Sequence, residues 1–187
     1  MKKIVAFTGS GRKEGNTSTI VNEVLKGAAE FNAQIKIYNI KDMDIKPCRG
    51  CFYCRKFEQC CIKDDMNEVL NDIKEADAVV FSSPIYMCQV SGQVKQLMDR
   101  LYPLLSGESG NYELRYGVKE TVAIYSQGAP NVDSFKEYIE LNNRVLSFLG
   151  LNIINTIICS GANDLKAVLE NKELLSKAYA IGKELSM

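Results

Sequence analysis

The chain has 187 residues, enough for one α/β domain that can bury a full core without disulfides or metals. Its 23 basic residues balance 23 acidic ones, so no net field attracts nucleic acid or an anionic membrane surface, and neither partner is expected. Histidine is absent, which excludes Ser-His and Cys-His catalysis and every histidine-containing zinc site.

Short apolar runs rich in Val, Ile and Phe alternate along the chain with longer amphipathic stretches. This pattern is typical of a parallel sheet covered by helices on both faces. In chain order, strands are expected at residues 3–7, 33–39, 78–82, 120–125 and 152–158, and helices at 17–30, 65–75, 91–105, 132–149 and 165–185. The alternation predicts one α/β domain over residues 1–187, a flavodoxin-like, doubly wound, five-stranded parallel sheet with strand order 2-1-3-4-5.

In such a fold, ligands bind beyond the carboxyl ends of the strands, where the strand order reverses. This rule selects the loops at residues 8–16, 83–90 and 126–131. The stretch from residue 40 to 64 is too long for an ordinary connection, and such segments are usually functional or disordered. It contains a cysteine-rich loop at residues 41–64, called the cysteine loop below.

A turn rich in glycine and hydroxyl groups, residues 9–17, follows the first strand and leads into a helix. A helix N-terminus offers unpaired N–H groups and a partial positive charge, to which neutral side chains add donors. The spacing is neither G-x-x-x-x-G-K-S/T nor G-x-G-x-x-G, which favours a monophosphate over ATP or a dinucleotide. The alternative is an ordinary helix start after a glycine turn. After the third strand, Pro84 and Tyr86 would flank a flat ligand, although Tyr86 alone fits packing equally well.

These motifs resemble the NAD(P)H-dependent FMN reductase superfamily and, within it, the iron-sulfur flavoproteins. The resemblance covers nearly the whole chain and rests on residues 9–17, on residues 83–86 with 91–92 and 95–100, and on the end of the cysteine loop at residues 63–66. It implies FMN as cofactor. It assigns Ser10, Arg12, Asn16, Thr17 and Ser18 to the phosphate, Pro84, Ile85, Tyr86 and Met87 to the ribityl chain and isoalloxazine ring, and Ser126, Gln127 and Gly128 to the other edge of the ring.

The expected helix at residues 91–105 carries charged residues at helical spacing. Lys95 and Asp99, at i and i+4, predict a surface ion pair. For Asp99 and Arg100 the resemblance suggests a subunit contact, because related flavoproteins form dimers around their flavins.

Five of the seven cysteines fall between residues 48 and 61. No export signal and no run of 18 apolar residues is found, so a cytoplasmic location is expected, where cysteines are more often reduced, metal-binding or redox-active than paired in disulfides. Cys159, at a strand end, is expected to be packing. Cys88 would lie near the flavin, although a lone cysteine is usually a small buried hydrophobe.

The spacing Cys48-x2-Cys51-x2-Cys54-x5-Cys60 is, by resemblance, the motif of iron-sulfur flavoproteins, and it would hold a 4Fe-4S cluster. Four thiolates are needed to ligate a cubane, and C-x2-C spacings direct successive sulfurs at neighbouring irons. Cys60 is chosen over Cys61 on the family spacing. The alternatives are free cysteines, two disulfides, or a zinc site, which fits least because its cysteine pairs are usually well separated. A glycine at position 50 permits the tight chain path.

The resemblance implies a flavin-dependent oxidoreductase that passes electrons between FMN, the cluster and a ferredoxin-like carrier or small-molecule acceptor, with NAD(P)H as a donor. The cofactors would carry the chemistry, so no catalytic side chain is expected. The rival is an NAD(P)H-dependent FMN or quinone reductase without a cluster. A flavodoxin-like carrier is a third hypothesis, but flavodoxins have a shorter phosphate loop and are usually acidic. A homodimer or homotetramer is also implied.

Overall fold

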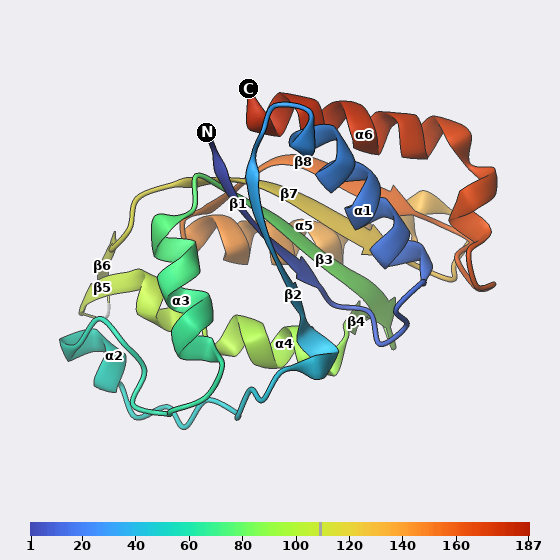
Figure 1. The fold of residues 1–187 in the computed structure, drawn as a ribbon. Helices are drawn as coiled ribbons and strands as arrows, with labels where there is room; N and C mark the ends of the chain where they lie inside the picture. Colours follow the sequence, from blue (N-terminus) through green and yellow to red (C-terminus); the bar gives the residue numbers. More distant parts are fainter. Residues whose placement is uncertain (109) are drawn as a thin grey trace.

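The computed structural model describes residues 1–108 and 110–187, and its main sheet has the predicted topology. Five strands run parallel in the order β2-β1-β3-β7-β8, which confirms the flavodoxin-like fold (Figure 1). The strands are β1 (Lys3–Thr8), β2 (Gln34–Asn39), β3 (Ala78–Tyr86), β7 (Lys119–Ser126) and β8 (Leu151–Cys159). Each overlaps one of the predicted strands.

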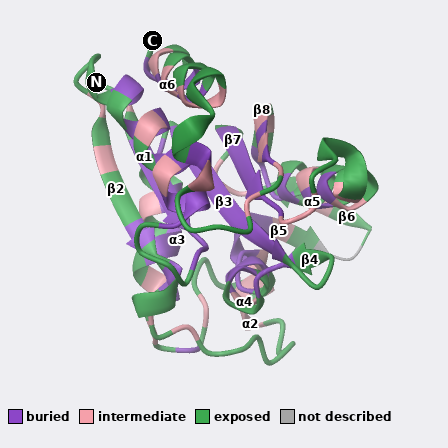
Figure 2. Ribbon diagram, turned by 90° about the vertical axis from the view of Figure 1, so that its right-hand side faces the viewer, coloured by how far each residue is buried: buried purple, intermediate pink, exposed green. Residues whose placement is uncertain are grey.

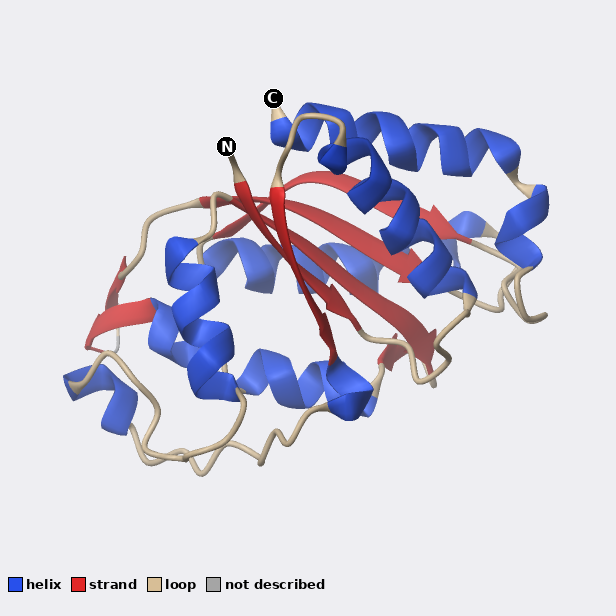
Figure 3. Ribbon diagram, viewed as in Figure 1, coloured by secondary structure: helices blue, strands red, loops and turns tan. Residues whose placement is uncertain are grey.

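Helices cover both faces of the sheet (Figure 3). On one face lie α1 (Asn16–Ala29) and α6 (Lys172–Ser186), and on the other lie α3 (Met66–Glu75), α4 (Gly92–Asp99) and α5 (Lys136–Phe148). Each face has its own apolar core, and the central strand β3 is buried except at Tyr86 (Figure 2). Burial on both faces explains why the strands read as nearly continuous apolar runs.

The third strand is longer than predicted, and it changes the shape of the loop that follows. β3 continues to Tyr86 and pairs antiparallel with β4 (Gln89–Val90), so the expected loop at residues 83–90 is largely a hairpin. Local alternation does not reveal such a strand extension, because its pairing partner is a strand of only two residues.

The helix expected at residues 91–105 ends early. After α4, the chain forms a 3₁₀ turn, η2 (Tyr102–Leu104), and then the hairpin of β5 (Leu105–Glu108) and β6 (Asn111–Leu114). Pro103 explains the stop, because proline cannot donate to a helix and disfavours helical geometry in the preceding residue.

Further short helical segments lie between the main elements. η3 (Val132–Phe135) precedes α5 and η4 (Ala167–Glu170) precedes α6, while η1 (Ile40–Asp42) and α2 (Tyr53–Lys56) lie between β2 and α3. None of the described helices is long and apolar enough to cross a membrane.

Candidate functional site

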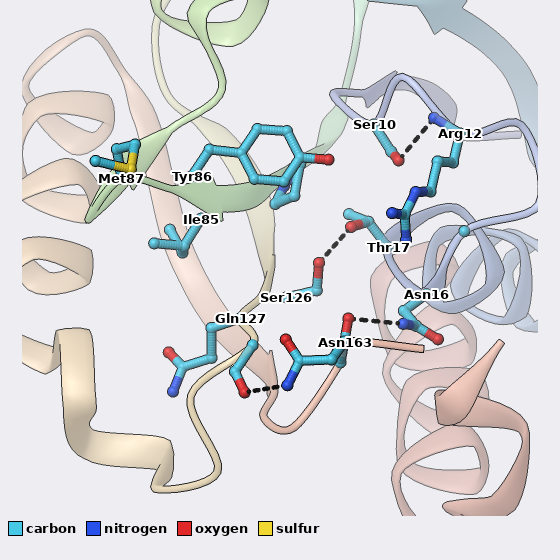
Figure 4. Close-up of a pocket in the computed structure, with 14 residues that line it drawn as sticks. Ser10, Arg12, Asn16, Thr17, Ile85, Tyr86, Met87, Ser126, Gln127 and Asn163 are labelled. Carbon is cyan, nitrogen blue, oxygen red and sulfur yellow. Dashed lines mark hydrogen bonds between the residues drawn. The ribbon is translucent and has the colours of Figure 1, made fainter. Parts of the chain in front are cut away.

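A pocket of about 440 Å³ opens at the carboxyl ends of β1, β3, β7 and β8, where the rule for this fold places ligands (Figure 4). Its volume lies in the range of cofactor sites. The lining residues are Ser10, Arg12, Gly15, Asn16, Thr17, Pro84, Ile85, Tyr86, Met87, Ser126, Gln127, Gly128, Ala162 and Asn163. Eleven of the twelve predicted cofactor residues are therefore brought together, and Ser18 is the exception.

The first turn of α1 supplies unpaired backbone donors to this pocket. No side chain caps the helix, its first turn has no acidic residue, and the earliest helical N–H bond runs from Thr19 N to Gly15 O at 3.0 Å. The preceding N–H groups have no partner within the helix, and they lie at its positive end. Arg12 is the one charged residue among the described lining residues. This corner of the pocket suits a compact anion.

Neutral hydroxyl groups surround the same corner. The Thr17 and Ser126 hydroxyl oxygens lie 2.6 Å apart and both residues are buried, while Ser10 Oγ accepts a hydrogen bond from the Arg12 N–H at 3.1 Å. In Figure 4 these side chains lie together on one side of the hollow. They offer hydrogen bonds without adding formal charge.

Asn16 and Ser18 hold the loops instead of offering free donors. Asn16 Nδ2 donates to the carbonyl oxygens of Ala162 and Asp164 at 3.2 and 2.9 Å, and its Oδ1 accepts from Val168 N–H at 3.0 Å. Ser18 Oγ donates to Arg12 O at 3.2 Å. Both side chains were expected to bind phosphate directly. In the structure their hydrogen bonds fix the start of α1 against its neighbours, and Asn16 also lines the pocket.

The β3–β4 hairpin forms the opposite rim of the pocket. Its two turn residues, Met87 and Cys88, both have positive φ, +47° and +64°, as a tight two-residue hairpin turn requires. The turn leaves Met87 94% exposed and Tyr86 51% exposed at the pocket mouth. An exposed aromatic ring beside a concave site is available to a flat ligand.

The loop after β8 closes the pocket, and the sequence analysis missed it. Asn163 Nδ2 donates to Gly128 O at 3.0 Å, and a Cβ at Gly128 would lie 2.3 Å from Asn163 Oδ1, so a larger residue there would displace the Asn163 side chain. Ala162 N–H also bonds to Gln127 O at 2.9 Å. The available signal was the polar run that follows the fifth strand, because that strand ends at the same edge of the sheet.

The cysteine loop lies away from the pocket. It leaves the end of β2 and reaches α2 at the far end of the molecule before returning to α3 (Figure 1). The Cys51 and Cys61 sulfurs lie 3.5 Å apart, but no group of three or more Cys, Asp or Glu side chains in residues 1–108 and 110–187 is arranged to hold a metal ion. The predicted ligand set is therefore not assembled as a closed site.

Three of the predicted ligands nevertheless lie within electrostatic reach of the fourth, Cys54. Burial raises the pKa of the Cys54 thiol, and the nearby sulfurs of Cys60, Cys48 and Cys51 raise it further. All these cysteines are free thiols. Gly50 has φ of +60°, which confirms the tight path expected there.

Contacts with the rest of the chain hold the cysteine loop in place. Arg115 Nη2 donates to Cys54 O at 3.1 Å, and the Tyr116 hydroxyl donates to Glu58 O at 3.2 Å. At the base of the loop, Asp44 N–H donates to an Asp65 carboxylate oxygen at 2.7 Å. These contacts connect the cysteine loop to the residues that follow the β5–β6 hairpin, and they close the loop at its base.

A buried ion pair also anchors the loop. Arg100 and Asp64 form a two-bonded contact, Nη1 to Oδ2 at 2.6 Å and Nη2 to Oδ1 at 2.9 Å, with side chains 1% and 0% exposed. The subunit contact suggested for Arg100 is therefore wrong, because this side chain is buried within its own chain. The surface pair of Lys95 and Asp99 is confirmed at 2.6 Å.

The two isolated cysteines differ in their surroundings. Cys159 is buried, as expected for a packing residue. Cys88 is exposed and lines a shallow hollow beside Tyr138, next to the pocket but outside its lining. The expectation that a lone cysteine is buried fails at Cys88, because a hairpin tip has no neighbours to cover it.

Two comparisons relate the chain to known proteins. An iron-sulfur flavoprotein of Methanocaldococcus jannaschii is 39% identical over 122 residues, which are 65% of this chain and 61% of that protein. An iron-sulfur flavoprotein of Archaeoglobus fulgidus is 34% identical over 115 residues, 62% of this chain and 58% of its own length. The chain spans about three-fifths of the length of these relatives.

A solved structure supports the fold, and a family model supports the assignment. The azoreductase of Bacillus anthracis superposes with a TM-score of 0.76 at 15% identity, covering 98% of this chain and 100% of that one. The family model described as NADPH-dependent FMN reductase matches residues 2–129, which include the glycine-rich turn at residues 9–17, the cysteine loop and the β3–β4 hairpin. This chain therefore belongs to the NADPH-dependent FMN reductase family.

Proposed function

We propose that the chain binds FMN in the pocket at the carboxyl ends of its strands and acts as an NAD(P)H-dependent flavin oxidoreductase. The observation that carries the proposal is the uncapped first turn of α1, which faces the pocket beside buried neutral hydroxyls and Arg12. One phosphate fits this corner, and no second helix N-terminus contributes to the lining. Membership of the FMN reductase family names the same cofactor.

The residues around the pocket then have distinct tasks. The backbone N–H groups at the start of α1, with Ser10, Thr17 and Arg12, hold the phosphate. Asn16 and Ser18 keep that turn in place through bonds to neighbouring loops. Pro84, Ile85, Tyr86 and Met87 flank the isoalloxazine ring on one side, and Ser126, Gln127 and Gly128 face its other edge. Asn163 closes the site behind Gly128.

We also propose that Cys48, Cys51, Cys54 and Cys60 hold a 4Fe-4S cluster. The donor set fits in type and number, since all four are free thiols and the other three lie near Cys54. A second observation favours it. Arg100 Nε is buried and has no hydrogen-bond acceptor among the described residues, and the Cys60 thiol lies beside the guanidinium. Related proteins named iron-sulfur flavoproteins support the same assignment.

The two cofactors would give the chain its role in electron transfer. FMN exchanges electrons in pairs with a nicotinamide, whereas an iron-sulfur cluster exchanges them singly. The cysteine loop is exposed at Cys48 and Cys51, so a ferredoxin-like carrier, a small acceptor or another copy of the chain can approach it. A cytoplasmic location and a homodimer or homotetramer remain predictions.

An FMN reductase without a cluster is the second candidate. One observation favours it, the absence of a closed metal site among the described cysteines. Iron and acid-labile sulfide assays on anaerobically reconstituted protein separate the two functions. About four iron and about four sulfide ions per chain support the cluster, because a cubane contains that number of each. Protein that binds flavin but no iron supports the reductase without a cluster.

The purified protein is expected to release FMN, not FAD, when it is denatured. The pocket of about 440 Å³ has one anion-binding corner, at the start of α1, which suits the single phosphate of FMN. Chromatography of the released flavin gives the answer, with NADH and NADPH oxidation under steady-state conditions as the assay for activity. Stoichiometric FAD, or no flavin after reconstitution, would contradict this pocket assignment.

Changing Thr17 to Val is expected to weaken FMN binding by roughly 1–3 kcal/mol, about 5- to 150-fold in Kd, through loss of a buried hydroxyl beside a charged group. The shape of the side chain hardly changes. Thr19→Val is the matched control, because Thr19 lies on the same helix but outside the pocket lining. Titration of flavin fluorescence measures both constants, and equal affinities would place the phosphate elsewhere.

A further inference from the structure

Arg100, the residue that ends α4, is buried to an unusual degree for an arginine. Its residue exposure is 2%, and the side chain points into the base of the cysteine loop, away from solvent. Burying a charge is costly unless it is paired and hydrogen-bonded. The contacts of this guanidinium therefore indicate what it is placed to hold.

Two of its three nitrogens close the base of the cysteine loop. Arg100 Nη1 donates to Lys46 O at 2.5 Å and to Asp64, and Nη2 donates to the other Asp64 oxygen. Asp64 also accepts the Lys46 N–H at 2.9 Å. Lys46 stands two residues before Cys48 and Asp64 stands four residues after Cys60, so the guanidinium joins the two ends of the segment that carries the cysteines.

The third nitrogen is left over. Arg100 Nε is buried and has no acceptor within hydrogen-bond distance among the described residues. The two side chains that act on the guanidinium are Asp64, which Nη1 and Nη2 already bond, and Cys60. The Cys60 sulfur is therefore the acceptor left for Nε. Cys61, the adjacent thiol, turns instead toward Cys51.

We propose that Arg100 is a positioning residue that selects Cys60 as the fourth cluster ligand and donates an Nε–H hydrogen bond to its sulfur. The inference rests on the proposed function, because it requires the cluster. A thiolate that ligates iron carries negative charge, which satisfies the buried donor that the free thiol leaves unpaired. The choice between two consecutive cysteines is then made by α4 and not by the cysteine loop.

The hydrogen bond has a second consequence, for the reduction potential. Hydrogen bonds to ligating sulfurs, and burial, are among the factors that set the potential of an iron-sulfur cluster. Donation from a cation stabilises the reduced, more negative state of the cluster. Arg100 therefore holds the potential higher than the same cysteines would without it.

The test uses anaerobically reconstituted full-length protein with FMN bound, and it compares Arg100→Met with Arg100→Lys, Asp64→Asn and Arg144→Met. Arg144 is an exposed arginine on α5 and serves as the matched control. The readouts are the midpoint potential of the cluster, the rate at which an iron chelator bleaches it, and iron per chain. Retained FMN reports that each variant is folded, since Arg100 does not line the flavin pocket.

Arg100→Met is expected to lower the midpoint potential and to speed bleaching about 10- to 100-fold, the usual cost of losing an outer-shell partner. Arg100→Lys restores part of both, and Arg144→Met changes neither. Asp64→Asn separates donation from mere support of the loop. It removes the charge and one of the two acceptor oxygens of that carboxylate, which weakens the contact at the base of the loop but keeps the cation beside Cys60, so the potential does not fall, whereas a purely structural role would lower it in both variants.

The inference is overturned if the Arg100→Met protein binds the cluster and shows the midpoint potential and bleaching rate of the wild type. The cluster assignment itself would then still hold. If that variant loses FMN and is unfolded, the same comparison in Arg100→Lys decides, and unchanged values there overturn it. Wild-type protein that takes up no iron refutes the cluster itself, and the inference with it. Loss of iron in Cys61→Ala but not in Cys60→Ala would show that the wrong cysteine was assigned.

Discussion

Replacing any one of Cys48, Cys51, Cys54 or Cys60 with alanine is expected to abolish iron binding while FMN stays bound. Each change removes one of four ligands from a cofactor that four thiolates are needed to hold. FMN should remain because none of these cysteines lines the flavin pocket, which lies at the other side of the fold. Iron, acid-labile sulfide and flavin per chain are measured after anaerobic reconstitution.

Two cysteines serve as controls for this experiment. Cys61→Ala keeps its iron if Cys60 is the fourth ligand, and Cys88→Ala keeps both cofactors because Cys88 lies on the β3–β4 hairpin. Zinc in place of iron would contradict the cluster, and so would wild-type protein that takes up neither iron nor sulfide under anaerobic conditions. Aerobic samples are unsuitable, since oxygen destroys such clusters.

Changing Asp64 to Ala is expected to lower the free energy of unfolding by about 3–5 kcal/mol, the cost of breaking a buried ion pair by removing one partner. The Arg100 guanidinium would be left buried with only Lys46 O to accept its hydrogen bonds. Denaturant unfolding of cofactor-free protein measures the change. Asp99→Ala is the matched control, because it removes an ion pair whose side chains are half-exposed and which is worth about 0.3–0.5 kcal/mol.

The same carboxylate predicts a dependence of stability on pH. Burial alone would raise the pKa of Asp64, but hydrogen bonds from Arg100, Lys46 N–H and Met66 N–H lower it below its usual value. A lowered pKa in the folded state gives stability that is present above the unfolded value of about 3.9 and lost as pH falls through the folded value. The stability gap between wild type and Asp64→Asn should therefore shrink as the pH falls below about 4. A gap that stays constant would show that the carboxylate does not titrate with folding.

The sequence by itself determined the fold class and most of the residues that line the pocket at the sheet edge. Parallel strands buried on both faces leave continuous apolar runs, and the helices between them leave amphipathic ones, so strand order and binding edge follow from alternation alone. The glycine and hydroxyl residues before α1 predicted the candidate anion site. They could do so because an uncapped helix start and its flanking donors are neighbours in the chain.

Only the tertiary structure decided what depends on pairing across the chain. The loop after β8 joins the pocket through the hydrogen bond between Asn163 and Gly128, which are distant in sequence. The Asn16 side chain donates a hydrogen bond to the same loop. The resemblance suggested a subunit contact for Arg100, yet this side chain pairs with Asp64 inside its own chain. The partner of a buried charge lies wherever the fold brings it. Cysteine spacing could therefore predict a cluster. The residue that holds the base of the cysteine loop, Arg100, could be identified only from the packing of α4 against that loop.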